Sequence, residues 1–134
     1  MIGLISASLL AVPGASAYYL GGTVVYTIEA RRALLNIADD VLKGMQPLSE
    51  DYVTLCAQSM RTNLGATWSI AELGATGPAG TRYGHPPGIS VFAIDGPVTL
   101  TRRVETGHGD REQNMWTFAT TAFELMRQAL AEAP

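Results

Sequence analysis

Apolar residues recur along this chain at two different spacings, and the two spacings predict alternating helices and strands. Helical spacing is clearest from Asp110 to Glu132, where an apolar stripe follows one face. A second long helix is predicted from Glu50 to Leu64, with Ser49 able to cap its start and Gly65 its end. Shorter segments complete the helical set: Gly3 to Ala11, a turn at Ala17 to Leu20, Ile28 to Ile37, and a short helix capped by Asp39 or Asp40.

Four shorter runs predict strands. Thr67 to Leu73 and Ile89 to Ile94 are mostly apolar, which is typical of strands buried in the middle of a sheet. Val98 to Glu105 alternates and predicts an edge or hairpin strand, reached through the turn Asp95-Gly96-Pro97. Gly22 to Thr27 is rich in Thr, Val and Tyr and predicts a further strand. Helices and strands in alternation place the chain in the α/β class.

Length and charge narrow the class of protein. The 134 residues correspond to one domain, residues 1–134, large enough for one core. The net charge of −3 leaves no basic stripe for a phosphate backbone, so a nucleic-acid partner is not expected. Cys56 has no second cysteine to pair with and no Cys or His at metal spacing, which favours a reducing, cytoplasmic setting without a metal.

The N-terminal segment imitates a secretion signal. Met1 to Val12 is apolar, and Ala15-Ser16-Ala17 resembles a signal-peptidase site. No Lys or Arg precedes the apolar run, and the run is too short to span a bilayer. Pro13-Gly14 is equally typical of the end of a buried helix. We therefore expect no membrane partner and a cytoplasmic protein.

The segment from Gly74 to Gly88 is the strongest candidate for a binding site. Its five glycines and three prolines cannot continue a strand or a helix, and it directly follows a predicted strand. In open α/β sheets ligands bind beyond the carboxyl ends of strands, where glycine lets backbone N–H groups approach a ligand. The alternative is an ordinary connection between strands.

A series of motifs extends over nearly the whole chain, in the order Gly3-Leu4-Ile5-Ser6-Ala7, Val12-Pro13-Gly14-Ala15-Ser16, Gly21-Gly22-Thr23-Val24-Val25-Tyr26, Leu48-Ser49-Glu50, Gly74-Ala75-Thr76-Gly77-Pro78 and Gly109-Asp110-Arg111. This series resembles the C-terminal domain family of the competence/damage-inducible protein CinA. The resemblance implies a three-layer α/β/α sandwich around a mixed five-stranded sheet. Members with a known activity are nicotinamide mononucleotide amidohydrolases, which release ammonia and nicotinate mononucleotide without a cofactor.

The chain departs from the family pattern at functional positions. The family's nucleophilic serine lies in a Glu-Ser-x-Thr-Gly-Gly segment, of which Gly3 matches only the last glycine, so the sheet is expected to lack the family's first strand. Tyr26 matches the family, but the active-site lysine is replaced by Arg31, which stays protonated and cannot act as a base. Leu73 and Met115 replace a threonine and an arginine of the hydrolases. We expect the amidohydrolase activity to be lost or altered.

The resemblance predicts a mononucleotide pocket in which Tyr26 and Arg31 stand at the catalytic positions. Tyr26 and Gly77 should lie at the carboxyl ends of neighbouring strands, facing one cleft. Tyr26 can equally cap the core, and Asp110 can serve only as a helix N-cap. No metal or cofactor is expected. The predicted substrate contacts are Thr27, Gly74, Ala75, Thr76, Gly77, Pro78, Gly80, Asp110 and Arg111.

A non-catalytic interaction or structural module is the alternative function. An exposed sheet edge would then be covered either by a homodimer or by a preceding segment of a longer chain. Ser6 and Ser8 lie on an apolar helix without a nearby histidine or lysine, so we assign them to packing rather than to nucleophilic catalysis.

Overall fold

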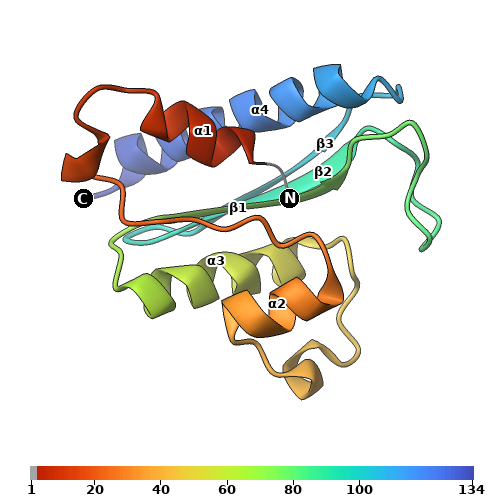
Figure 1. Cartoon of the computed structure of the whole chain (residues 1–134), viewed down its shortest axis with the longest axis horizontal. Coiled ribbons are helices and arrows are strands. Elements are labelled where there is room, and N and C mark those ends of the chain that lie inside the picture. Colours follow the sequence, from red (N-terminus) through yellow and green to blue (C-terminus); the bar gives the residue numbers. More distant parts are fainter. Residues whose placement is uncertain (1–2) are drawn as a thin grey trace.

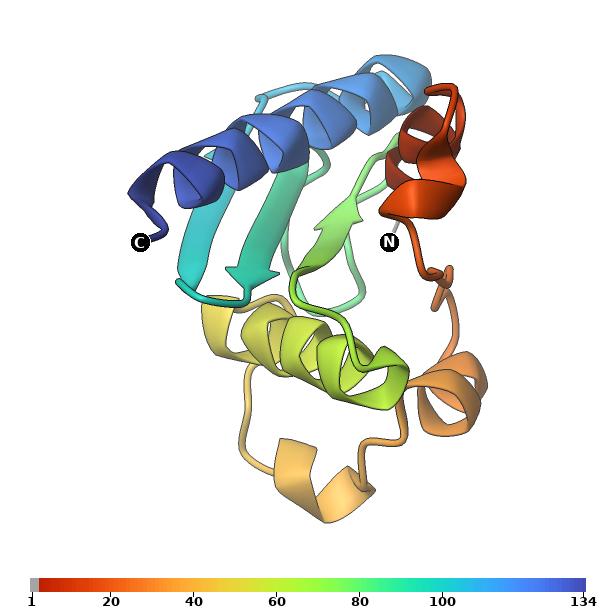
Figure 2. The same cartoon turned by 90° about the vertical axis from the view of Figure 1, so that its left-hand side faces the viewer.

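The computed structural model describes residues 3–134, and it has three layers (Figure 1). The central sheet contains β1 (Ser69–Ala75), β2 (Ile89–Asp95) and β3 (Leu100–Glu105) in the order β1-β2-β3. Helices α1 (Leu4–Leu10) and α4 (Arg111–Glu132) lie on one face, and α2 (Ile28–Leu35) and α3 (Glu50–Leu64) lie on the other (Figure 2). Two short 3-10 helices, Ala15–Ala17 and Asp39–Leu42, complete the elements. The predicted α/β/α sandwich is confirmed.

Strand β2 is buried along its whole length and separates two cores. Because side chains alternate along a strand, Val91 and Ala93 pack toward α3, whereas Phe92 and Ile94 pack toward α4. The ring of Phe92 meets that of Phe118 edge to face, with 6.2 Å between centroids. This two-sided burial explains why the strand is an uninterrupted apolar run in the sequence.

The helix ends follow local capping chemistry. Ser49 accepts a hydrogen bond from the Tyr52 amide at the start of α3, and Gly65 ends that helix with φ of 63°. Asp110 accepts from the Gln113 amide and caps α4, as its sequence position predicted. Thr27 caps α2 in the same way, through the Ala30 amide.

The predicted strand from Gly22 to Thr27 is wrong. Residues 19–26 have no regular structure in the described chain, and Thr27 belongs to the start of α2. The residues have strand propensity, but a strand needs a neighbour to pair its backbone groups, and a cavity separates residues 17–23 from β1.

The sheet is not mixed within the described residues. Both pairs, β1 with β2 and β2 with β3, are antiparallel over their whole registers. Each pair joins strands that follow one another in the chain without an intervening helix, which is the connection that antiparallel pairing allows. Parallel pairing needs a crossover connection, and among the described residues no helix connects one strand to the next.

Candidate functional site

The glycine-rich loop after β1 is fastened to the start of α4 by one buried amide. Asn114 is completely buried, and its Nδ2 donates to the carbonyl oxygens of Thr76 and His108, at 2.9 Å each. Its Oδ1 accepts from Thr106 Oγ1 at 2.7 Å. A single side chain therefore joins the loop, the turn after β3 and the first turn of α4. We call the surface where these three segments meet the loop junction.

Close backbone packing at the loop junction requires glycine at two positions. A Cβ on Gly77, whose φ is 108°, would lie 2.5 Å from the carbonyl oxygen of Gly109. A Cβ on Gly88, whose φ is 89°, would lie 2.2 Å from Thr106 Oγ1. The loop is thus held against the turn before α4 by contacts that any side chain would obstruct.

Arg111 brings together two of the predicted site residues. Its Nη1 donates to the Gly77 carbonyl at 2.7 Å, and its Nη2 lies 3.5 Å from the Tyr26 hydroxyl. Gly77 lies just beyond the carboxyl end of β1, as expected, but Tyr26 reaches the junction from an irregular segment rather than from a strand. Tyr26 is 74% exposed, so its ring stands free at the edge of the junction.

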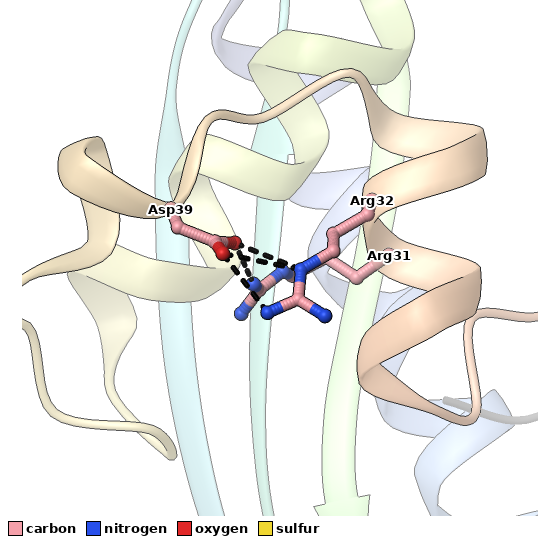
Figure 3. A network of polar contacts seen from close by, with 3 residues as sticks. All are labelled: Arg31, Arg32 and Asp39. Carbon is pink, nitrogen blue, oxygen red and sulfur yellow. Dashed lines mark hydrogen bonds and ion pairs between the residues drawn. The ribbon is translucent and has the colours of Figure 1, made fainter.

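Arg31, the other residue at a predicted catalytic position, is held by a carboxylate on its own side of the sheet (Figure 3). Its Nη2 lies 2.6 Å from Asp39 Oδ1, and Arg32 binds the same carboxylate through Nε and Nη2, with Nη2 at 2.9 Å from Oδ2. The hydrogen bond from Arg32 lowers the pKa of Asp39 below its usual value, and the charges of both arginines act in the same direction. The same contact raises the pKa of Arg32.

The Nε atom of Arg31 is buried and has no hydrogen-bond partner among the described residues. Through its hydrogen bond to Asp39, the Arg31 guanidinium connects α2 to the following 3-10 helix. No described hydrogen bond joins it to Tyr26 or to the glycine-rich loop.

Several other predicted substrate-contact residues already make hydrogen bonds or packing contacts within the protein. Thr27 Oγ1 and Asp110 Oδ1 are used as helix caps. The Ala75 carbonyl accepts from the Gly88 amide at 2.7 Å and closes the loop. Gly74 packs tightly against β2, since a Cβ there would lie 2.5 Å from Ser90 Oγ. Thr27 thus belongs to α2, and the other three residues shape the loop junction, whereas Arg111 and Tyr26 present groups to solvent.

Sequence reasoning missed Asn114, and it offered Asp39 only as a possible cap of the short helix that the structure starts at Ala38 without a side-chain cap. The signal for Asn114 was available, because it is a polar residue among the apolar positions of α4, one turn after the N-cap Asp110. The signal for Asp39 was the pair of adjacent arginines a few residues before it. Neither signal identifies the partner without the tertiary structure.

Fold and junction together define an α/β/α domain whose candidate site lies between a glycine-rich strand-to-strand loop and a helix N-terminus. The family model "CinA C-terminal domain" matches residues 2–130. The chain belongs to this family.

Relatives and solved structures agree with that assignment. A CinA-like protein of Myxococcus xanthus is 33% identical over 134 residues, covering 98% of this chain and 32% of the relative. One from Prochlorococcus marinus strain MIT 9313 is 40% identical over 95 residues, covering 71% of this chain and 22% of the relative. The crystal structure of the competence damage-inducible protein A of Klebsiella pneumoniae superposes with a TM-score of 0.88 at 29% identity, covering 97% of this chain and 81% of that one.

The chain thus spans a third or less of the length of these two curated relatives. Within the part of the chain that the structure describes, no helix combines the length and the apolar character needed to cross a membrane.

Proposed function

We propose that this chain binds a phosphorylated mononucleotide of the nicotinamide class at the loop junction and does not deamidate it. The observation that carries the proposal is the position of Arg111, whose guanidinium lies between the glycine-rich loop and Tyr26. Three segments that are far apart in the sequence thereby contribute to one surface.

The chemistry of the loop junction suits a phosphate monoester with an attached ring. Arg111 supplies a permanent positive charge in a forked geometry, at the first turn of α4, where the helix dipole also favours an anion. The exposed ring of Tyr26 offers a face on which a pyridine or a base can stack. Glycines of the adjacent loop allow close approach of a ligand to the backbone.

We expect no deamidation because Arg31 and Ser6 are already engaged in other contacts. Arg31 is paired with Asp39 and stays protonated, so it cannot accept a proton from a nucleophile. On the N-terminal helix, Ser6 Oγ accepts a hydrogen bond from the Tyr19 hydroxyl at 2.8 Å. Neither arrangement activates a hydroxyl for attack on a carboxamide.

Binding is tested by thermal shift and calorimetry with nicotinamide mononucleotide, nicotinate mononucleotide and inorganic phosphate. A ligand present at a hundred times its dissociation constant adds about 2.7 kcal/mol to the free energy of unfolding. Arg111→Gln should abolish this gain, whereas Arg127→Gln, about 24 Å further along the same helix, should leave it intact. Equal responses of both variants contradict the assignment of the phosphate to Arg111.

Catalysis is tested by ammonia release from nicotinamide mononucleotide. The expected result is no release above the uncatalysed background. Turnover that disappears in Ser6→Ala or Ser8→Ala contradicts the proposal and identifies the nucleophile. A protein that binds none of the mononucleotides favours the second candidate, a non-catalytic interaction module.

A further inference from the structure

Strand β3 has an open outer edge. It stands last in the strand order and, within the described residues, pairs with β2 alone. Figure 2 shows β3 as the outermost strand on its side of the sheet, with α4 on one face and α3 on the other. The backbone groups along the outer edge of β3 are therefore available to another strand.

Alternate residues of β3 direct their backbone groups toward this edge. The Thr106 amide donates to the carbonyl of Gly88, which lies opposite it when the register of β2 and β3 is continued by one residue. Backbone groups alternate between the two sides of a strand, so those of Thr101, Arg103 and Glu105 point away from β2. An approaching strand meets its hydrogen-bonding partners at these three residues.

The charges beside the open edge are self-complementary. Arg103 and Glu105 lie two positions apart and project from the same face of the sheet. Their side chains are 38% and 64% exposed, and Arg103 Nε lies 3.5 Å from Glu105 Oε1. A second copy that runs antiparallel can place its glutamate opposite this arginine and its arginine opposite this glutamate. Opposite charges that face each other across two strands stabilise a sheet, and like charges destabilise it.

These charges select one register. Two identical antiparallel strands are related by a twofold axis, and a residue on that axis faces its own copy. An axis at Arg102 or Arg103 sets two arginines opposite each other, and an axis at Glu105 sets two glutamates opposite each other. Only an axis at Val104 brings Arg103 opposite Glu105, and the symmetry makes this pair twice.

The register centred on Val104 also matches the direction of the backbone groups. Arg103 and Glu105 both point outward, so each of the two Arg103–Glu105 pairs can exchange two hydrogen bonds. Val104 then faces its copy in a non-hydrogen-bonded pair, where the two Cα atoms are about 4.5 Å apart. On the other face of the sheet Arg102 comes opposite the uncharged Thr106, so no like charges meet there.

Arg103 has room and donors for a carboxylate of a second copy. A hollow of about 440 Å³ lies beside it, lined also by Leu48 and Ser49 at the start of α3 and by His85. A guanidinium has five N–H donors, and the described contacts of Arg103 are long, at 3.4 Å to the Leu48 carbonyl and 3.5 Å to Glu105. A carboxylate that approaches from outside the edge can therefore bind the same guanidinium.

We propose that the outer edge of β3 is a dimerisation surface at which a second copy of this chain pairs antiparallel, with the twofold axis at Val104. The sheet then continues from one copy into the other, and two Arg103–Glu105 pairs cross the interface. Because the shared ladder is short, we expect a weak dimer that forms at concentrations of about 10 to 500 µM.

Sedimentation equilibrium of the full chain tests this surface. Arg103→Glu and Glu105→Arg should each weaken association at least tenfold, because each variant sets like charges opposite each other in two pairs. An equimolar mixture of the two variants should associate about as well as the native chain, since opposite charges then face each other again. Contacts within one chain do not change on mixing, so recovery in the mixture reports pairing between chains. Circular dichroism confirms that both variants are folded.

Cross-linking tests the position of the axis. Val104→Cys places two thiols opposite each other, at a Cα separation of about 4.5 Å that a disulfide can span, so diamide should give a covalent dimer. Thr101→Cys is the control, because its two copies lie about 20 Å apart in this register and should stay unlinked. Cys56 is buried, and the native chain gives the background of the assay.

Several results overturn the proposal. One is a native chain that stays monomeric up to about 500 µM. Another is a dimer whose association is unchanged in both charge variants, which places the interface elsewhere. A third is a mixture of the variants that associates no better than either variant alone. Cross-linking through Thr101→Cys that equals or exceeds cross-linking through Val104→Cys contradicts the axis at Val104.

Discussion

Replacing Asn114 by alanine should loosen the loop junction and destabilise the whole domain. The side chain is fully buried and makes three hydrogen bonds, two to the carbonyls of Thr76 and His108 and one from the hydroxyl of Thr106. The substitution leaves two carbonyl oxygens and a hydroxyl without this partner, at one buried and two partly buried hydrogen bonds. At about 1 kcal/mol for each lost hydrogen bond, the expected loss is about 3 kcal/mol. For a domain of this size such a loss lowers the melting temperature by roughly 10 °C.

Urea unfolding followed by circular dichroism measures the loss, with an unchanged slope showing that unfolding stays cooperative. Asn63→Ala is the control, because it removes an amide on α3 that makes one longer hydrogen bond of 3.3 Å to the Leu35 carbonyl. This control should cost less than about 1 kcal/mol. Hydrogen exchange should quicken at residues 76–88 in the Asn114 variant alone. Equal stability losses in the two variants refute the central role of Asn114.

Three further predictions use single substitutions. Gly77→Ala should lower the free energy of unfolding by at least about 2 kcal/mol in the same urea assay, because the added Cβ clashes with backbone and the residue has a positive φ. Gly84→Ala is its control and should cost about 1 kcal/mol, because Gly84 has a φ of 95° but no atom within 4 Å of an added Cβ. Arg61→Ala should lower the free energy of unfolding by about 2 kcal/mol. It removes the cation that lies 2.5 Å from the Asp95 carboxylate, whose side chain is only 4% exposed. Adding Asp95→Asn should recover part of that loss, and a strictly additive double variant contradicts the coupling. Burial raises the pKa of the Cys56 thiol to about 11, so the thiol stabilises the fold fully below the unfolded value near 9 and less as pH rises toward 11. Compared with Cys56→Ala, the native chain should lose up to about 1.4 kcal/mol per pH unit in this window, and parallel pH profiles contradict this.

The ends of the long helices could be predicted from sequence because capping is a local interaction. Ser49 and Gly65 bound α3, and Asp110 starts α4, through hydrogen bonds or backbone angles that involve residues within one or two turns. The apolar run of β2 similarly indicates burial on both faces whatever the neighbours are. The alternating run before Glu105 likewise identified β3 as an edge strand.

The loop junction shows where prediction from sequence stopped. The glycine-rich loop and the start of α4 were both recognised as candidates, but their connection through Asn114 was not, because it joins positions 38 residues apart. Arg31 was predicted at a catalytic position, and its pairing with Asp39 was not foreseen. A long side chain can reach several partners, and only the packed structure decides which one it meets.

By itself, the sequence determined the properties that depend on neighbouring residues: helix ends, burial of the central strand and the conformational freedom of the glycine-rich loop. The tertiary structure decided the conformation of residues 22–27. Despite their strand propensity they pair with no strand among the described residues, and Thr27 caps α2. It also decided that, within the described residues, β1 pairs with β2 alone. The physical reason is the same in both cases, because a strand is completed only by hydrogen bonds to another segment, whereas a helix satisfies its backbone within itself.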